Sequence, residues 1–403
     1  AKIAALNDRA RRRLDHCRWI LTQGEKYCDA LTEAELLIAV EHIDAYTPDN
    51  DPYAEHDFGA IKLNDNYIPA YLWMGGLLGE FGRLPEQSQI LKQAIVIDPL
   101  NELLAINVEA NLTRQGDYEG GKELLHDLDA LLPDSASLMR IMSGHAIQSG
   151  DLVEGWQYAN RSYDLEPDSP VVIEALAGAW ASIGVADKAE RLLLEGLEIA
   201  SDNFGLQSSY FWVLIRQGRL ENAQSLLTEQ FGGSIESLPE QLQQYYYFQK
   251  GMISLAARDN DGARNFFEKA MLDESDQTWN GKQVLYATIL SALHLDAGNT
   301  VLAEQRLETA ERSVRRARIN GVDDAEIYYT ESSIYALKGE TTAALDSLQK
   351  AYERGFRAAW MLEIDLRLAS IHAEPQFTEI KQQIEKDIVQ ARTEVESFAL
   401  AIR

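Results

Sequence analysis

The sequence predicts an all-α fold, a solenoid of antiparallel helix hairpins, and two periodic features support this prediction. Five glycines stand 34 residues apart: Gly82, Gly116, Gly150, Gly184 and Gly218. Three prolines keep the same period: Pro99, Pro133 and Pro167. A fixed period of this length marks stacked supersecondary units, each too small to bury its own apolar face. The chain is therefore expected to form an array of similar helical hairpins.

Each period contains the signals for two helices joined by a tight turn. Gly116 follows one amphipathic run and can adopt the left-handed conformation that ends a helix, since it has no Cβ. Asp117 can then accept hydrogen bonds from the free amides of the next helix. Gly150, followed by Asp151, repeats this arrangement. The prolines fall after the second helix, where they block its continuation.

Alignment on the glycines gives five units without insertion, which start at Ile68, Glu102, Ala136, Pro170 and Phe204. The third unit places Met139, Ser143, Gly155, Ser162 and Pro167 at its fourth, eighth, twentieth, twenty-seventh and thirty-second positions. This pattern resembles the tetratricopeptide repeat family, which implies a right-handed superhelical solenoid. After short insertions the register resumes in three further units, marked by Gly251, Ala263, Ala270, Ala287, Gly298, Ala303, Ala310, Gly339, Ala344 and Ala351. The resemblance covers Ile68 to Phe356.

Four regions follow from this register. Residues 1–67 are expected to form a degenerate N-terminal hairpin or cap, with helices at Arg18–Leu21 and Leu36–Ile43 and a polar loop at Thr47–Asp57. Residues 68–237 hold the five in-phase repeats, and residues 238–356 hold three more after the insertion Leu238–Gln243. Residues 357–403 are expected to supply capping helices, Trp360–Leu368 and Phe377–Val389. Stability should then be close to a sum of repeat and neighbour-interface terms.

Composition narrows the possible functions. Of the 403 residues, 46% are hydrophobic, which suffices for a continuous core, and no run of about 18 apolar residues indicates a membrane span. A formal charge of -27 argues against a nucleic-acid partner and favours a basic or apolar partner over an acidic one. The basic cluster Arg312, Arg315, Arg316 and Arg318 is interpreted as a helix C-terminus, where cations complement the helix dipole.

No catalytic or metal-binding pattern is present in the sequence. The seven histidines are scattered, and no phosphate-binding loop, nucleophile elbow or metal-ligand spacing occurs. The chain is therefore predicted to be no enzyme and to carry no cofactor or metal. Cys17 and Cys28 leave two alternatives open: a disulfide across a hairpin broken at Gly24, or two reduced, buried thiols.

The resemblance places partner-binding residues on the first helix of each repeat, at the second, fifth, ninth and twelfth positions. The fifth positions of the first four units are Leu72, Ile106, Arg140 and Glu174. The ninth positions are small except Trp212 and Met252. Trp212, Tyr245, Phe248 and Met252 have two interpretations: an aromatic pocket for anchor side chains, or packing at the irregular joint after the fifth repeat. No repeat carries the Lys and Asn pair of the family's carboxylate clamp.

The sequence thus predicts a non-catalytic scaffold that binds a protein or peptide. A second resemblance concerns the closing motif Arg367, Leu368, Pro375, Gln376 and Phe377, which looks like that of the repeat regions of bacterial winged-helix regulators and adenylate cyclases. It implies the sensory or assembly module of a larger regulator, of which this chain is expected to be a fragment. A periplasmic location is preferred to a cytoplasmic one. The alternatives are a small-ligand sensor domain and an oligomerisation arm of a membrane-anchored transcriptional regulator or nucleotide cyclase.

Overall fold

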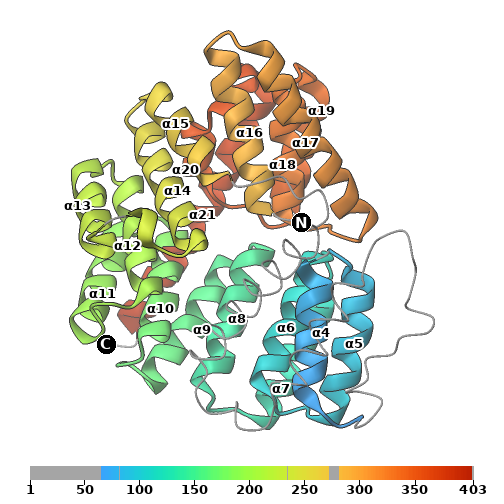
Figure 1. Ribbon diagram of the computed structural model, residues 1–403. Coiled ribbons are helices and arrows are strands. Elements are labelled where there is room, and N and C mark those ends of the chain that lie inside the picture. The colour runs from blue at the N-terminus through green and yellow to red at the C-terminus, as the bar shows by residue number, and fades with distance from the viewer. Residues whose placement is uncertain (1–64, 81, 234, 272–280, 402–403) are drawn as a thin grey trace. The chain divides into compact units, whose positions relative to one another are not determined.

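The computed structural model describes residues 65–80, 82–233, 235–271 and 281–401. The chain divides into two units, Ala1–Tyr67 and Ile68–Arg403. Within the described residues all regular structure is helical, and consecutive helix pairs of the second unit pack side by side (Figure 1). The predicted all-α helical solenoid is confirmed. The helices expected at Arg18–Leu21 and Leu36–Ile43, the loop Thr47–Asp57, and Cys17 and Cys28 lie outside the described residues.

Eight hairpins, called repeats 1 to 8, make up the described part from Ile68 to Glu353. Repeats 1 to 4 are the pairs α4 (Ile68–Glu80) with α5 (Leu84–Ile97), α6 (Glu102–Arg114) with α7 (Tyr118–Leu131), α8 (Ala136–Ser149) with α9 (Leu152–Leu165), and α10 (Pro170–Ser182) with α11 (Ala186–Ile199). Repeats 5 to 8 are α12 (Phe204–Arg216) with α13 (Leu220–Phe231), α14 (Glu240–Ala256) with α15 (Asn260–Ala270), α16 (Gly281–Asp296) with α17 (Thr300–Ile319), and α18 (Ala325–Leu337) with α19 (Thr341–Glu353). A short 3-10 helix, η2 (Ile235–Ser237), lies in the insertion between repeats 5 and 6.

The turns inside the repeats have the predicted chemistry. Gly116 has φ 71° and Gly150 has φ 95°, the left-handed conformation that ends the first helix of each pair. Asp117 and Asp151 then cap the second helices, accepting hydrogen bonds from the amides of Gly120 (3.0 Å) and Glu154 (2.9 Å). Local sequence signals therefore determine where each hairpin turns.

The C-terminal residues form α20 (Ala359–Ile364), the 3-10 helix η3 (Leu366–Ile371) and α21 (Pro375–Ala401). The helix expected at Trp360–Leu368 is interrupted at Asp365, because the Asp365 carboxylate accepts a hydrogen bond from the Arg367 amide and starts a tighter helix. The last helix begins earlier and ends later than the predicted Phe377–Val389. It starts at Pro375, whose missing amide is tolerated in a first turn.

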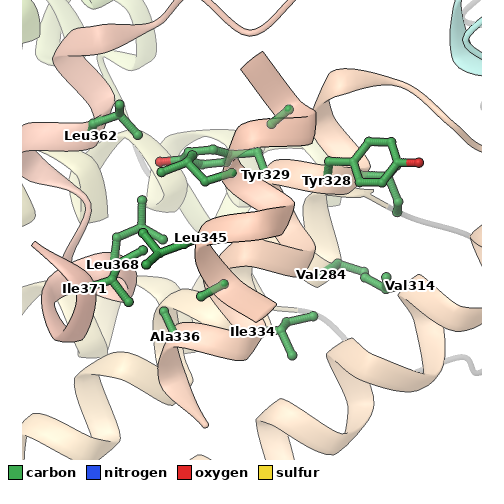
Figure 2. Packing of buried hydrophobic residues seen from close by; sticks show 14 of the residues in the cluster. Val284, Val314, Tyr328, Tyr329, Ile334, Ala336, Leu345, Leu362, Leu368 and Ile371 are labelled. Atoms are coloured by element: carbon green, nitrogen blue, oxygen red, sulfur yellow. The ribbon is translucent and has the colours of Figure 1, made fainter. Parts of the chain in front are cut away.

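This C-terminal segment fills part of the core. Leu362, Leu368 and Ile371 are fully buried against repeat 8, beside Tyr329 and Leu345 (Figure 2). Further along, α21 contacts α9, and its residues Ala391 and Val395 are buried among apolar residues of repeats 3 to 5.

Contacts also join parts of the chain that are not neighbours in the row of repeats. The Arg354 Nη1 donates to the carbonyl of Gly116, 3.0 Å away, and the Arg392 Nε donates to the carbonyl of Ile183, 2.9 Å away. Each arginine thereby pairs with a free carbonyl at the end of a first helix, where a cation is favourable. The expectation that stability is a sum of nearest-neighbour terms is therefore incomplete for this chain.

Two glycines, Gly355 and Gly150, allow the end of repeat 8 to lie close to the turn of repeat 3. A Cβ built on Gly355, which has φ 103°, would lie 2.2 Å from the carbonyl oxygen of Gln148 and 3.0 Å from the amide nitrogen of Gly150. A side chain at Gly355 would therefore displace the turn of repeat 3.

Candidate functional site

The first helices of successive repeats contact one another, so their equivalent positions form rows. The contacting pairs include α4 with α6, α6 with α8, α8 with α10 and α10 with α12. We call the surface at the fifth and ninth positions of these helices the first-helix face. Each residue on it is placed by the helical period of its own repeat and by the contact with the next.

On repeats 1 to 4 the ninth positions of this face are open, meaning that they carry small residues that are exposed or half-buried. Gly76, Ala110 and Gly178 are exposed, and Gly144 is half-buried. A Cβ built on Gly76, Gly144 or Gly178 would meet no atom of a described residue within 4 Å. The backbone of these helices is therefore accessible at three of the four positions without any side chain in the way.

The four predicted fifth-position residues lie along the same face. Leu72, Ile106, Arg140 and Glu174 are all partly exposed. The Glu174 carboxylate accepts a hydrogen bond from the Ser209 hydroxyl at 2.8 Å. Arg140 makes no hydrogen bond or ion pair with any of the described residues. Its guanidinium can donate five hydrogen bonds, and no described residue accepts any of them.

Two apolar residues at second positions belong beside this face and were not singled out from the sequence. Leu103 of α6 is 54% exposed and Val171 of α10 is 51% exposed. Leucine and valine at the start of a helix also suit packing in the core, so their residue types gave no sign of exposure. Their exposure depends on which face of the helix the neighbouring repeats leave uncovered.

The aromatic group predicted around Trp212 is engaged in contacts within the chain. The Trp212 ring lies 6.0 Å from that of Phe248 and 6.3 Å from that of Trp360, centroid to centroid. Phe248 in turn packs against Phe267 and Tyr286. These are the contacts that the joint-packing interpretation expects, with Trp360 of α20 as an additional member.

The other two members of the group also face into the joint. The Tyr245 hydroxyl donates to the Ser208 hydroxyl at 2.7 Å and accepts from the Gln249 amide at 2.7 Å. Burial raises the pKa of Tyr245 above its ordinary value. Met252 packs against the apolar clusters on both sides of the joint.

On repeats 7 and 8 the equivalent fifth positions, Thr288 and Tyr329, are buried under η3. The Arg367 Nη1 donates to the Thr288 hydroxyl at 2.9 Å, and the Tyr329 hydroxyl donates to the Asp365 carboxylate at 2.7 Å. Arg367 and Asp365 are themselves joined by an ion pair of 2.6 Å. Only 3% of Arg367 is exposed, so this pair is withdrawn from water.

The pairing of these groups fixes their charge states. Burial alone would raise the pKa of Asp365, but the charge of Arg367 and the hydrogen bonds from Arg367 and Tyr329 outweigh it and lower that pKa. Burial, followed by the charge of Asp365, raises the pKa of Tyr329 well above its usual value. The carboxylate and the guanidinium stay ionised and hold η3 on the faces of α16 and α18.

The described part of the chain contains neither a metal-binding cluster nor a membrane-spanning helix. No group of three or more His, Cys, Asp or Glu side chains could hold a metal ion there. Nor is any described helix both long and apolar enough to cross a membrane.

Comparison with known proteins gives likenesses of fold. One family model, described as a protein of unknown function (DUF3768), matches residues 21–71, which lie mostly outside the described part. No curated protein matches the chain. Among solved structures, that of the APC/C hetero-tetramer Cut9–Hcn1 is 14% identical with a TM-score of 0.45, and the match covers 88% of this chain and 60% of that one.

Two other solved structures show the same degree of likeness. A human IFIT1 dimer with m7Gppp-AAAA is 13% identical with a TM-score of 0.47, over 87% of this chain and 88% of that one. A tetratricopeptide repeat protein from Parabacteroides merdae is 12% identical with a TM-score of 0.40, over 70% of this chain and 97% of that one. Identities and TM-scores this low assign no function to the chain.

Proposed function

We propose that the protein is a non-catalytic scaffold that binds an extended segment of a partner protein along the first-helix face of repeats 1 to 4. One observation carries the proposal: the ninth positions of these repeats are open, whereas the equivalent Ala292 and Ser333 of repeats 7 and 8 are buried. Surface that the described part of the chain leaves uncovered, with glycine at its centre, allows a partner backbone to lie close to the helices.

The chemistry of this face suggests what such a segment carries. Leu103, Ile106 and Val171 offer exposed or half-buried aliphatic surface for apolar side chains. Arg140 offers hydrogen-bond donors for a carbonyl group of the segment. The acidic body of the protein favours a partner that is basic or uncharged elsewhere.

For the wider context we infer the sensory or assembly module of a larger bacterial regulator, with the periplasm as the preferred compartment. The support is the closing motif from Arg367 to Phe377 in the sequence. Its residues Arg367, Leu368 and Phe377 are buried, so the motif is a core element of the repeat unit. Detection of the native flanking domains would test this context independently of the binding face.

Affinity capture with variant baits tests the binding proposal. The double variant Gly144→Leu, Gly178→Leu fills the open positions, and leucine in place of a helical glycine should not weaken the fold. A matched control, Glu195→Leu, adds leucine at an exposed position of the second helix α11. From a bacterial lysate and envelope fraction, a partner held by the wild type and the control but lost by the double variant supports the proposal.

Two other outcomes would contradict it. A partner kept by the glycine variant but lost by Trp212→Ala, Phe248→Ala would place binding at the joint after repeat 5. No partner with any bait, together with a shift of the sedimentation coefficient with protein concentration, would point to the oligomerisation role. Circular dichroism confirms that each variant is folded.

A further inference from the structure

Repeat 2 and repeat 8 meet through a polar junction, which we call the latch: Arg114 and Gly116 on one side, and Asp323, Asp324 and Arg354 on the other. The Asp323 amide donates to the carbonyl of Arg114 at 2.8 Å. The Arg354 guanidinium bridges the junction, since it donates to the Gly116 carbonyl at 3.0 Å and to the Asp323 carboxylate. More than 200 residues separate these two sides of the latch in the sequence.

Asp323 is the fixed charge of the latch. Its carboxylate also accepts hydrogen bonds from Arg318 and, at 2.8 Å, from the Tyr328 hydroxyl. Burial opposes its ionisation, but the hydrogen bonds and charges of these partners outweigh burial and lower the pKa of Asp323. Asp323 therefore stays ionised at every pH near neutral.

Asp324 is placed differently. Its carboxylate accepts the Ile327 amide at 2.9 Å and so caps α18, while charged and titratable groups from three sides act on it. These groups are Arg114 from α6, Tyr118 at the start of α7, and Glu326 from its own side. Arg114 is the only cation among them. Burial lowers the pKa of the Arg114 guanidinium.

Burial dominates at this carboxyl group. It raises the pKa of Asp324 to about 6, and the same surroundings raise the pKa of Tyr118 to about 12. Asp324 is half-buried, and Arg114 and Tyr118 belong to repeat 2, so separation of repeats 2 and 8 would expose the Asp324 carboxyl group further. In the separated state its pKa would be that of an ordinary aspartate.

We propose that the contact between repeats 2 and 8 is a pH-sensitive latch, closed more firmly when Asp324 is protonated and loosened when Asp324 is ionised. The closed state binds the Asp324 proton more tightly than the open state does. Closure is therefore strengthened below pH 6 and weakened as the pH rises through 6. Between pH 5 and pH 8 the closed-to-open ratio should change about tenfold, given pKa values of about 6 closed and about 4 open.

The Asp323 amide gives a direct measure of closure, because its hydrogen bond to Arg114 crosses the latch. Hydrogen exchange of the full chain is measured from pH 5 to pH 8 and expressed as a protection factor, which removes the intrinsic pH dependence of exchange. The expected result is a protection factor about tenfold higher at pH 5 than at pH 8. In Asp324→Asn, which keeps the helix cap but cannot titrate, it should be the same at both pH values.

Asp259→Asn is the matched control, because Asp259 is an exposed cap that accepts the Gly262 amide at 2.9 Å, far from the latch. It should respond to pH as the wild type does. Arg354→Met removes the bridging hydrogen bonds and should lower protection at every pH. A wild-type protection factor that does not change with pH, a response that survives Asp324→Asn, or unchanged protection in Arg354→Met would each overturn the proposal.

Discussion

In repeats 1 to 4 the ninth position of the first helix is open to the outside, as at Gly76 and Gly178, whereas in repeats 7 and 8 the equivalent Ala292 and Ser333 are buried. Both regions follow the same repeat register. At the fifth positions the two regions differ as well: Asp365 and Arg367 of the C-terminal segment cover Thr288 and Tyr329 of repeats 7 and 8, whereas the fifth positions of repeats 1 to 4 stay partly exposed. Repeat position thus predicts which residues share a face, but only long-range contacts decide whether that face is available to a partner.

The largest expected effect on the free energy of unfolding comes from replacing an arginine by methionine. The same substitution is compared in the region under η3 and on the first-helix face of repeats 1 to 4. Arg367→Met leaves the Asp365 carboxylate buried without its ion-pair partner and should reduce the free energy of unfolding by about 3–5 kcal/mol. Arg140→Met, on the open face, should change it by less than about 0.5 kcal/mol. Urea denaturation measures both, and equal effects would mean that the two faces do not differ in burial.

The second prediction concerns the contact of repeat 3 with the C-terminal side. Gly355→Ala introduces a Cβ 2.2 Å from the Gln148 carbonyl oxygen at a positive φ, so it should cost about 2–4 kcal/mol. Gly339→Ala is the control, because Gly339 has φ 74° but no atom within 4 Å of its built Cβ. It should cost only about 1 kcal/mol in the same denaturation experiment. A similar cost for both would show that the approach of Gly355 to repeat 3 contributes little.

The smallest expected effect compares two glycines inside first helices. Gly178→Ala should increase the free energy of unfolding by about 0.5–1 kcal/mol, because alanine favours the helix and the new methyl meets no atom. Gly251→Ala should decrease it by about 1–2 kcal/mol, because the methyl would lie 2.8 Å from the buried Phe267 ring. Thermal and chemical denaturation report the sign of each. Destabilisation by Gly178→Ala would show that the first-helix face of repeat 4 is covered.

Local signals made most of the fold predictable from the sequence. Gly116, Gly150 and the aspartates that follow them specify turns and caps within a few residues, and the structure has both where the period places them. The repeat register, read with the family resemblance, likewise grouped Leu72, Ile106, Arg140 and Glu174. The openness of the face that they share could not be predicted, because it depends on where the C-terminal segment packs.

Contacts between residues far apart in the sequence are not indicated by the 34-residue period. Trp360 against Trp212, Arg367 against Thr288 and Arg354 against Gly116 join residues far apart in the sequence, and Trp360 and Arg367 lie outside the repeat register. A single sequence contains no signal that pairs such positions. The break at Asp365 was missed for a related reason, since it depends on a carboxylate that turns back to the Arg367 amide.

The contacts of Arg354 and Arg392 limit the gain or loss of whole repeats in this chain. Arg354 and Arg392 donate hydrogen bonds to the turns of repeats 2 and 4, respectively. Gly355 lies against the turn of repeat 3. An ordinary solenoid tolerates the loss or duplication of one unit, because each unit recognises only its neighbours. Here a deletion or duplication between Gly116 and Gly184 would shift these turns relative to the C-terminal residues that contact all three of them. Such a variant would keep every hairpin intact and still lose the register between the two ends of the repeat unit.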